Sequence, residues 1–438
     1  MKITLINTYD SHGGAARAAY RLHKGLRQIG EDCQMLVRYK SSGDEAVSDI
    51  KVKITEETFE DDFFLSVIQQ QYINAHRSDI SNTFFSLPYP GCDLSKLRLI
   101  KEAHILNLHW MAYYQSPVTL QQLFVTGKPV VWTLHDQWPF TGGCHYSAKC
   151  KKYVEDCSGC PQLADDPFDL SAAVLADKVD LFRGANLTIV TPSRWLADCA
   201  RASRLFRDLR IEVIPNSLET NMFFPMPKAY AKETLNIPSD TVTVLFGAEN
   251  GEEKRKGFHE LLATIRHCRK SGDFQGLVVK ERIIILCFGH VSSELKSMDI
   301  PVMPLGYLKS DDLVQTAYSA ADIFVLPSLE DNLPNTVLEA LSCATPVVAF
   351  DVGGIPDVVI DNVTGKLAPV GDIEKMGDAI ISLVFNPDQR EEMGRNGRET
   401  MVKGYSLDIQ ARRYLSLYKE LNLSSSSTLT ALREGRRT

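Results

Sequence analysis

The sequence contains no apolar run as long as the roughly 18–20 residues that a membrane-spanning helix needs. It also lacks a strong excess of one charge, because 48 Lys and Arg stand against 55 Asp and Glu, for a net charge of −7. A chain with this balance has no overall positive field with which to hold nucleic acid. The first ten residues become polar too soon for a signal peptide. We therefore expect a soluble, cytoplasmic protein that binds no nucleic acid.

Two phosphate-binding signatures are absent as well. There is no G-x-x-x-x-G-K-[ST] loop, and no G-x-G-x-x-G follows the first expected strand. If the protein holds a phosphate, helix N-termini and basic side chains must therefore do so.

What the sequence does contain is an alternation of short apolar runs with segments of helical spacing. Most of the runs are continuously apolar, which is typical of strands buried on both faces of a parallel sheet. The expected strands are 2–7, 34–37, 105–108, 130–134, 187–190, 212–214, 242–246, 282–288, 323–326 and 347–350. The expected helices include 15–29, 193–209, 257–270, 311–320, 336–342 and 372–385. This alternation predicts a doubly wound α/β fold.

A stretch rich in proline and turn residues at 215–227 divides the alternation into two series. A chain of 438 residues is long enough for two or three domains of roughly 100–200 residues each. We expect two Rossmann-like domains, at 1–218 and 219–405, which face each other across a ligand cleft. Residues 406–422 are expected to form a helix that packs back on the first domain, and 423–438 a disordered polar tail. Residues 41–100 have no clear assignment.

The most informative segment follows the expected strand 323–326. A polar loop leads into a helix that starts near Asn335 or Thr336, which places Asp331 at the carboxyl end of the strand and Glu339 in the first helical turn. Free backbone amides at a helix start suit a phosphate, and carboxylates suit sugar hydroxyls. The alternative is structural: Glu339 completes a capping box with Thr336, and Asp331 caps a turn.

At this segment the chain resembles the retaining glycosyltransferases of family 4, also described as glycosyl transferases group 1. Motifs in the expected order cover nearly the whole chain. They are Gly13-Gly14, Thr133-Leu-His135, Thr191-Pro-Ser-Arg-Trp195, Ile214-Pro-Asn216, Arg255-Lys-Gly-Phe258 and Pro327-Ser-x-Glu-Asp-x7-Glu-Ala340, which is followed by the 343–356 segment. The resemblance implies the GT-B fold and transfer of a sugar from a nucleotide-diphosphate donor.

The resemblance also implies residue roles on the donor side. Glu339 would bind the donor ribose and Asp331 the outer hydroxyls of the donor sugar, while Lys256 and Arg255 would neutralise the diphosphate. Backbone groups of the helix entrance would hold sugar and phosphate, namely Asn332, Leu333, Pro334, Asn335 and Thr336. The structural alternative for Lys256 is a solvated basic run at 254–256.

The sequence departs from the family pattern at two places. The first acidic position of the motif falls on Asp331 instead of a Glu, with Glu330 beside it, and either side chain could point inward. The usual Gly-Arg after the first strand of the second domain is Gly247-Ala248 here, so that Arg255 has to supply the charge. An acidic stretch at 249–253 lies between them.

Three positions are candidates in the N-terminal half. Gly13 and Gly14 follow the first strand and open a helix, so that backbone amides can approach a ligand. His135 ends a strand, and by resemblance would face the donor sugar or its phosphate. Ordinary strand–helix turn glycines and a satisfied structural histidine are the alternatives. His109 sits at a comparable strand end and is a weaker candidate.

Four of the ten cysteines lie within seventeen residues, in the pattern C-x5-C-x6-C-x2-C. The terminal C-x2-C has the spacing of a tetrahedral thiolate site, and two further thiols complete four ligands. We expect a structural zinc held by Cys144, Cys150, Cys157 and Cys160, in a loop that shapes the acceptor side. Unpaired thiols or a disulfide are the alternatives, and a subset of family 4 resembles this region.

The segment 193–209 has an apolar face and a face of four arginines at helical spacing. Such a helix could rest on an anionic membrane that carries a lipid-linked acceptor. A core-facing helix with a solvated basic face explains the same pattern.

The resemblance to family 4 implies a retaining glycosyltransferase, and the common uses of that family imply a role in surface polysaccharide synthesis. There is no Asp-x-Asp motif, which disfavours a metal-dependent, single-domain sugar transferase. We therefore expect no cofactor for catalysis and, by resemblance, front-face transfer in which the leaving phosphate helps to deprotonate a glycan or lipid-linked acceptor. The rivals on the same fold are a sugar-nucleotide epimerase, a sugar phosphorylase and a non-catalytic nucleotide-sugar-binding protein.

Overall fold

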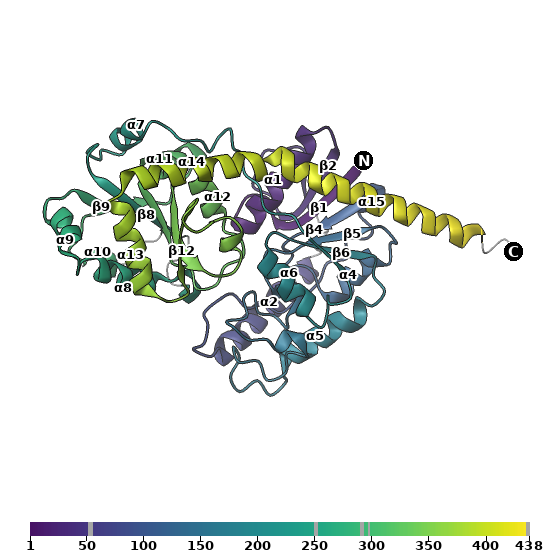
Figure 1. The fold of residues 1–438 in the computed structure, drawn as a ribbon. Coiled ribbons are helices and arrows are strands. Elements are labelled where there is room, and N and C mark those ends of the chain that lie inside the picture. Colours follow the sequence, from purple (N-terminus) through teal and green to yellow (C-terminus); the bar gives the residue numbers. More distant parts are fainter. Residues whose placement is uncertain (51–55, 249–252, 290–292, 297, 435–438) are drawn as a thin grey trace. The chain divides into compact units, whose positions relative to one another are not determined.

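The computed structural model describes residues 1–50, 56–248, 253–289, 293–296 and 298–434 (Figure 1). The chain forms two compact units. Unit 1 comprises Met1–Asn216 together with Leu407–Thr438, and unit 2 comprises Ser217–Ser406. The changes of unit thus lie at 216/217 and 406/407, against the expected 218/219 and 405/406.

Unit 1 is built on one sheet of seven parallel strands in the order β3-β2-β1-β4-β5-β6-β7. Its central strands consist almost wholly of buried residues, as continuous apolar runs require. The strands are β1 (Lys2–Tyr9), β2 (Asp32–Tyr39), β3 (Val47–Asp49), β4 (Ile105–Leu108), β5 (Val130–Thr133), β6 (Leu187–Thr191) and β7 (Arg210–Val213).

The helices of unit 1 come from both ends of the chain. They are α1 (Gly14–Gln28), α2 (Glu56–His76), α3 (Arg98–Glu102), α4 (Pro117–Phe124), α5 (Leu170–Leu181), α6 (Arg194–Ala202) and α15 (Leu407–Glu434). Helix α15 packs on α1 and shares a core cluster with it that includes Leu22, Ala411 and Tyr414 (Figure 1). The approach is close, because a Cβ on Gly25 would lie 2.8 Å from the Leu407 carbonyl oxygen.

Unit 2 has a second parallel sheet of six strands, in the order β10-β9-β8-β11-β12-β13. The strands are β8 (Val242–Ala248), β9 (Ile283–Gly289), β10 (Val302–Gly306), β11 (Ile323–Leu326), β12 (Val347–Asp351) and β13 (Gly365–Pro369). The helices are α7 (Lys228–Thr234), α8 (Phe258–Cys268), α9 (Gly272–Val279), α10 (Ser293–Lys296), α11 (Asp311–Ala320), α12 (Asn335–Ser342), α13 (Ile373–Val384) and α14 (Pro387–Gly404). The two ends of unit 2 lie side by side, because the Leu218 amide donates to the Tyr405 carbonyl at 3.0 Å.

A buried ion cluster stabilises the base of β11. Asp322 accepts from Lys228 at 2.9 Å and from Lys232 at 3.0 Å, and the Thr243 amide donates to the same carboxylate at 2.9 Å. Burial opposes the ionisation of Asp322, but the two lysines and the hydrogen bonds outweigh it and hold the pKa of this carboxyl well below its usual range.

The prediction of two parallel α/β sheets is confirmed, and all ten expected strands are present. Three short strands were not expected, namely β3, β10 and β13, and the unassigned stretch 41–100 contains β3, α2 and the start of α3. The expectation of a disordered tail at 423–438 differs from the structure, because α15 continues to Glu434. No glycine or proline interrupts the chain between 407 and 434, so nothing breaks the helix there. Residues 435–438 lie outside the described residues.

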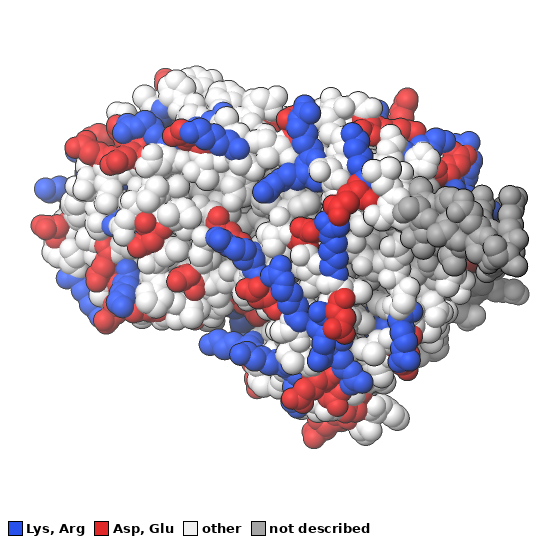
Figure 2. Space-filling view, turned by 45° about the vertical axis from the view of Figure 1, so that its right-hand side comes forward, with Lys and Arg blue, Asp and Glu red and all other residues white. Residues whose placement is uncertain are grey.

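Within the described residues, no helix is both long and apolar enough to cross a membrane. On the face drawn in Figure 2, lysine and arginine side chains are interspersed with aspartate and glutamate. This face therefore carries no extended patch of a single charge.

Candidate functional site

The central site of unit 2 forms where the loop after β11 meets the 3₁₀ turn Lys254–Lys256. Strand β11 ends at Leu326, and the loop that follows runs to the start of α12. Asp331 and Asn332 in this loop are buried, at 5% and 4% exposure. The loop therefore presents its carboxylate to the protein interior beside the carboxyl end of the sheet, where open α/β sheets bind ligands.

Two basic side chains meet this carboxylate. Lys256 Nζ donates to Asp331 Oδ2 at 2.7 Å, and Arg255 NH1 lies 3.5 Å from the same oxygen. Arg255 also donates to Glu253, at 2.7 and 3.1 Å, and to the Glu330 carbonyl oxygen at 3.2 Å. The expected trio of Arg255, Lys256 and Asp331 is thus brought together in one place, although 75 residues separate Lys256 from Asp331.

The geometry also distinguishes between Glu330 and Asp331. Asp331 has the buried side chain that pairs with Lys256, whereas Glu330 is half-buried and offers its backbone carbonyl to Arg255. Burial opposes the ionisation of Asp331, but Lys256 and Arg255 outweigh it and hold the pKa of Asp331 below its ordinary value. Asp331 is therefore an ionised, buried carboxylate.

Two glycines allow the loops to come this close. Gly257 has φ 71°, and a Cβ there would lie 1.7 Å from the Pro327 carbonyl oxygen. Gly353 has φ 60°, and a Cβ there would lie 1.7 Å from the Asp331 carbonyl oxygen. The Gly354 amide donates to that same carbonyl at 3.2 Å. The loops after β11 and β12 and the turn before α8 are thus packed backbone to backbone.

Glu339 does not cap its own helix. The N-cap of α12 is Pro334, no side chain caps the helix, and Glu339 is its fifth residue instead of a first-turn residue. The capping-box alternative for Thr336 and Glu339 is therefore wrong, because a box needs Thr336 at the N-cap position. Glu339 is buried at 4% exposure, and Leu333 at 5%. Pro334, Asn335 and Thr336 are partly exposed at the helix entrance.

In unit 1, Gly13 is the N-cap of α1, with φ 84° and open space where a side chain would stand. Gly14 is exposed. Asp10 lies in the loop between β1 and α1 and connects it to the residues after β2. It is buried and accepts hydrogen bonds from the Ser42 amide at 2.8 Å and from Ser41 Oγ at 2.7 Å. The start of α1 therefore offers exposed backbone on a fixed base, and the role of Asp10 was not expected.

His135 lies just beyond β5 and belongs to a cluster of imidazoles. Its Nε2 is 3.0 Å from His109 Nδ1, and the two rings are stacked. Removal from water lowers the pKa of His135 to about 4, although Asp136 opposes this, and lowers the pKa of His109 well below its usual value. Both rings are therefore neutral near pH 7, and His109, the weaker sequence candidate, is the direct partner of His135.

The neighbouring residue Asp136 forms a second pair that sequence reasoning missed. Its Oδ2 lies 2.6 Å from His145 Nδ1 and accepts from Trp110 Nε1 at 2.9 Å. Burial opposes the ionisation of Asp136, but His145 outweighs it and lowers the pKa of Asp136. The motif Leu134-His-Asp could have indicated Asp136 as a candidate site residue, because an acidic residue directly after a strand-end histidine lies at the same edge of the sheet.

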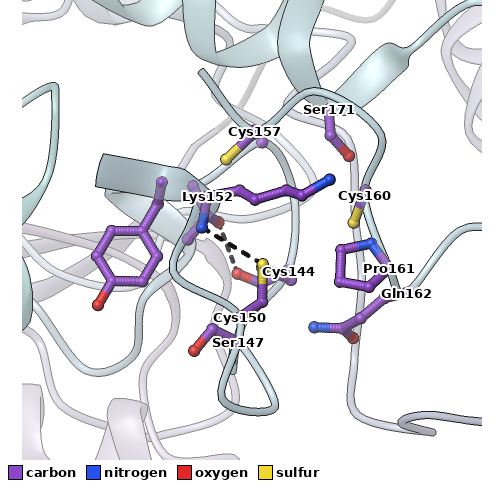
Figure 3. A pocket seen from close by; sticks show the side chains of 12 residues that line it. Cys144, Ser147, Cys150, Lys152, Cys157, Cys160, Pro161, Gln162 and Ser171 are labelled. Atoms are coloured by element: carbon purple, nitrogen blue, oxygen red, sulfur yellow. Dashed lines mark hydrogen bonds between the residues drawn. The ribbon is translucent and has the colours of Figure 1, made fainter. Parts of the chain in front are cut away.

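All four predicted cysteine ligands line one pocket of unit 1 (Figure 3). Their thiols are free of disulfides, and Cys144 and Cys157 are buried. In the described parts of the chain, no three His, Cys, Asp or Glu side chains are already arranged so as to hold a metal ion.

The expected helix at 193–209 is shorter than predicted. Helix α6 ends at Ala202, where Ser203 takes an extended conformation. Beyond it, Arg204 NH1 donates to the Glu155 carbonyl at 3.2 Å and Arg207 NH2 to the Val154 carbonyl at 2.7 Å. These two arginines therefore hold the cysteine-containing loop, and the four arginines do not share one face of a continuous helix.

Comparison with known proteins gives the following similarities. Residues 241–386 match the family described as glycosyl transferases group 1. The chain is 29% identical over 259 residues to the α-maltose-1-phosphate synthase of Mycolicibacterium smegmatis, which covers 54% of this chain and 64% of that protein. It is 29% identical over 222 residues to a D-inositol 3-phosphate glycosyltransferase of Saccharomonospora viridis, covering 48% of this chain and 50% of that protein. The chain thus spans about half to two thirds of these relatives.

A longer but weaker similarity links the chain to an Escherichia coli K12 protein named as a colanic acid biosynthesis glycosyl transferase, WcaC. The identity is 24% over 362 residues, covering 80% of this chain and 83% of that protein. Among solved structures, sucrose-phosphate synthase from Thermosynechococcus elongatus superposes with a TM-score of 0.66 at 18% identity, covering 96% of this chain and 99% of that one. Anabaena Alr3699/HepE in complex with UDP and glucose has a TM-score of 0.62 at 14% identity, with coverages of 96% and 99%. These structures establish the GT-B fold.

Proposed function

We propose that this protein is a retaining, metal-independent glycosyltransferase. It moves a sugar from a nucleotide-diphosphate donor to a glycan or lipid-linked acceptor in surface polysaccharide synthesis. The observation that carries the proposal is the meeting of Lys256 and Arg255 with the buried carboxylate of Asp331 in the loop that leads to α12.

This arrangement suits a diphosphate leaving group. Breaking a glycosyl–phosphate bond places negative charge on the diphosphate, and fixed cations stabilise that charge in the transition state. Lys256 and Arg255 are fixed by their bonds to Asp331, Glu253 and the Glu330 carbonyl, so little reorganisation is needed when the charge develops. They supply the positive charge that a divalent cation supplies in metal-dependent transferases.

The carboxylates suit the hydroxyl groups of the donor. The resemblance to family 4 assigns Asp331 to the outer hydroxyls of the sugar and Glu339 to the ribose, and the two oxygens of a carboxylate can accept from two hydroxyls at once. The partly exposed start of α12, Pro334 to Thr336, adds backbone donors at the positive end of a helix.

In unit 1 we assign Gly13, Gly14 and His135 to the same reaction. Each follows a strand at the carboxyl edge of its sheet, the edge at which open parallel sheets bind ligands. Gly13 and Gly14 offer backbone to a phosphate, and the neutral imidazole of His135 can hydrogen-bond a sugar hydroxyl. The retaining outcome and front-face transfer rest on the resemblance to family 4.

The names of the similar proteins indicate which donor sugars should be tested first. Structures of HepE contain UDP, glucose or UDP-glucose, and the name of WcaC refers to colanic acid, a polysaccharide. UDP-glucose is therefore the first donor of the panel, followed by other UDP- and GDP-sugars.

The test is release of nucleoside diphosphate from this panel by the full-length protein, with and without acceptor glycans and with and without EDTA. We expect acceptor-dependent release that EDTA does not abolish, and a product whose anomeric configuration by NMR matches that of the donor. Interconversion of sugar nucleotides without release would indicate an epimerase, and a requirement for inorganic phosphate a phosphorylase. Binding of donors without any turnover would contradict the proposal.

A further inference from the structure

The loop between the 3₁₀ turn Trp138–Phe140 and α5 is long and irregular. Residues 141–169 contain one further short 3₁₀ turn, Lys152–Val154, and no other helix or strand. Loops of this length without secondary structure are uncommon in compact domains. Nevertheless, Tyr146, Tyr153 and Leu163 in this loop are buried at 6–8% exposure. Side-chain contacts therefore hold the loop in its conformation, among them the hydrogen bonds of Arg204 and Arg207 to the Glu155 and Val154 carbonyls.

Four thiols from two separate stretches of this loop surround one pocket (Figure 3). Cys144 and Cys150 come from the first stretch, and Cys157 and Cys160 from the second. The other lining residues include the polar Ser147, Gln162 and Ser171 and the aromatic Tyr153. The remaining cysteines of the chain do not line this pocket.

The backbone of the loop is strained at three residues in the stretches that carry the four cysteines. Ala148, Lys149 and Cys157 have φ of 50°, 68° and 62°, values that non-glycine residues seldom adopt. Such strain persists only where the surroundings impose it, and it is concentrated at ligand sites. The Lys152 amide donates to Cys150 Sγ at 3.4 Å, and the Gly142 amide donates to Cys157. Backbone donors to sulfur stabilise thiolates and tune the metals that they bind.

Basic groups surround the same sulfur atoms. Lys152 lines the pocket, and the electrostatic neighbours of Cys144 include Lys178 and Arg77. Lys178 is buried and held by the Trp138 and Thr141 carbonyls at 2.7 and 2.8 Å. Four thiolates and one dication carry a net charge of −2, and these cations are placed to balance it.

The geometry points to a structural zinc site formed by Cys144, Cys150, Cys157 and Cys160. Four thiolates and no other ligand suit a soft, tetrahedral metal, and zinc is the one that needs no redox chemistry. Because no three side chains of the described residues yet form a metal-holding group, binding is expected to draw the thiols inward to Zn–S distances of about 2.3 Å. Each thiol that becomes a ligand releases its proton.

The site has a consequence that rests on the proposed function. Cys144 is followed directly by His145, which pairs with Asp136, and Asp136 follows His135. Zinc would therefore fix the position of the His145–Asp136 pair beside the histidine assigned to the donor.

The test is the zinc content of the full-length protein, purified under reducing conditions and measured by mass spectrometry of the metal. We expect about one zinc per chain. The double variant C150S/C160S should lose the zinc, whereas the matched control C199S, at a half-buried cysteine outside the pocket, should keep it. Zinc that persists in the double variant, or a wild-type protein that stays zinc-free after reconstitution, would overturn the proposal.

A second measurement on the wild-type protein tests the proposal even if the double variant C150S/C160S does not fold. Cobalt substitution of the wild-type protein should give thiolate-to-cobalt charge-transfer bands and the intense visible bands of tetrahedral cobalt; without them the proposal fails. An intact mass that is lower by two hydrogens per disulfide would also contradict it, because disulfides would then occupy the thiols. Zinc content is independent of turnover, so these readouts separate the metal site from the proposed function.

Discussion

Lys256 Nζ donates to Asp331 Oδ2 across 2.7 Å and thereby joins the turn before α8 to the loop after β11. Arg255 lies 3.5 Å from the same carboxylate oxygen. This pairing fixes two positive charges beside the loop after β11 and holds the carboxylate ionised. The pair is therefore the first place to test the proposed reaction.

Replacing Lys256 by Met should lower kcat by about 10²–10³, the usual loss when one fixed donor to a developing anion is removed. The measurement is the initial rate of nucleoside diphosphate release at saturating donor. K254M, at an exposed lysine in the same 3₁₀ turn, is the matched control and should retain the wild-type rate. Equal rates for K256M and wild type would refute the assignment of Lys256.

Replacing Gly353 by Ala should weaken donor binding through the backbone of Asp331. The added methyl group would lie 1.7 Å from the Asp331 carbonyl oxygen, so that the loop after β11 must move. G371A is the control, because Gly371 also has a positive φ, 79°, but has open space around it. Both variants should lose about 1–2 kcal/mol of stability from the left-handed backbone. Calorimetric titration with the donor nucleotide should show weaker binding for G353A alone; equal binding by both variants would contradict the prediction.

Replacing Asp322 by Ala should destabilise unit 2 by about 3–5 kcal/mol, because it leaves the buried Lys232 without its counter-charge. Urea unfolding followed by circular dichroism measures this loss. The control is E399Q, which removes an exposed carboxylate that pairs with Lys403 on the surface of α14 and should leave the midpoint unchanged. A D322A midpoint equal to that of E399Q would show that the cluster contributes no stability.

Acidification should destabilise unit 1 through its buried histidines. The pKa of His135 is lowered to about 4 in the folded protein, against an unfolded value near 6.5. Between these values the unfolded chain binds more protons, so the free energy of unfolding falls as the pH falls from about 6.5 towards 4. His135 alone accounts for a loss of about 1 kcal/mol at pH 5.5, and His109 acts in the same direction.

Urea midpoints at pH 7.5, 6.5 and 5.5 measure this dependence. H135N should show a shallower decline than wild type, and H259N, at an exposed histidine of α8, should follow the wild-type curve. A wild-type midpoint that does not change over this range would contradict a neutral, buried imidazole pair.

The sequence predicted the central strands of both sheets because those strands are continuous apolar runs, as in β5 and β11. Three of the four edge strands, β3, β10 and β13, lack this signal. Strand β10 carries Pro304 and shifts register beside it, and β13 begins at a glycine and ends at a proline. An edge strand is paired on one side only, so that it tolerates residues which a central strand excludes. Helix α14 has a weak signal of its own, because its sequence is largely polar and its buried residues include glycines.

Part of the candidate site could also be predicted from motifs. The order of the motifs placed Lys256 and Asp331 in one site, because parallel strands end at the same edge of a sheet. Which of Glu330 and Asp331 turns inward depended on loop packing against Gly353, which a single sequence does not specify. The His145–Asp136 pair depended on the folding of an irregular loop, and the early end of α6 on Ser203 and on arginine contacts with that loop.

The hydrogen bond between Leu218 and Tyr405 brings the two ends of unit 2 together, and a bridge between Leu218 and Ser406 continues the contact. Unit 2 is therefore inserted into unit 1 as a closed segment of chain, and its termini are already adjacent. A gene fragment for residues 217–406 would therefore encode a unit whose two termini are adjacent. A short peptide that joins these termini would allow a circular permutant with new termini in another surface loop. Such a permutant would contain the Lys256–Asp331 pair in a chain of less than half the length of the whole protein, which would make the pair easier to study by NMR.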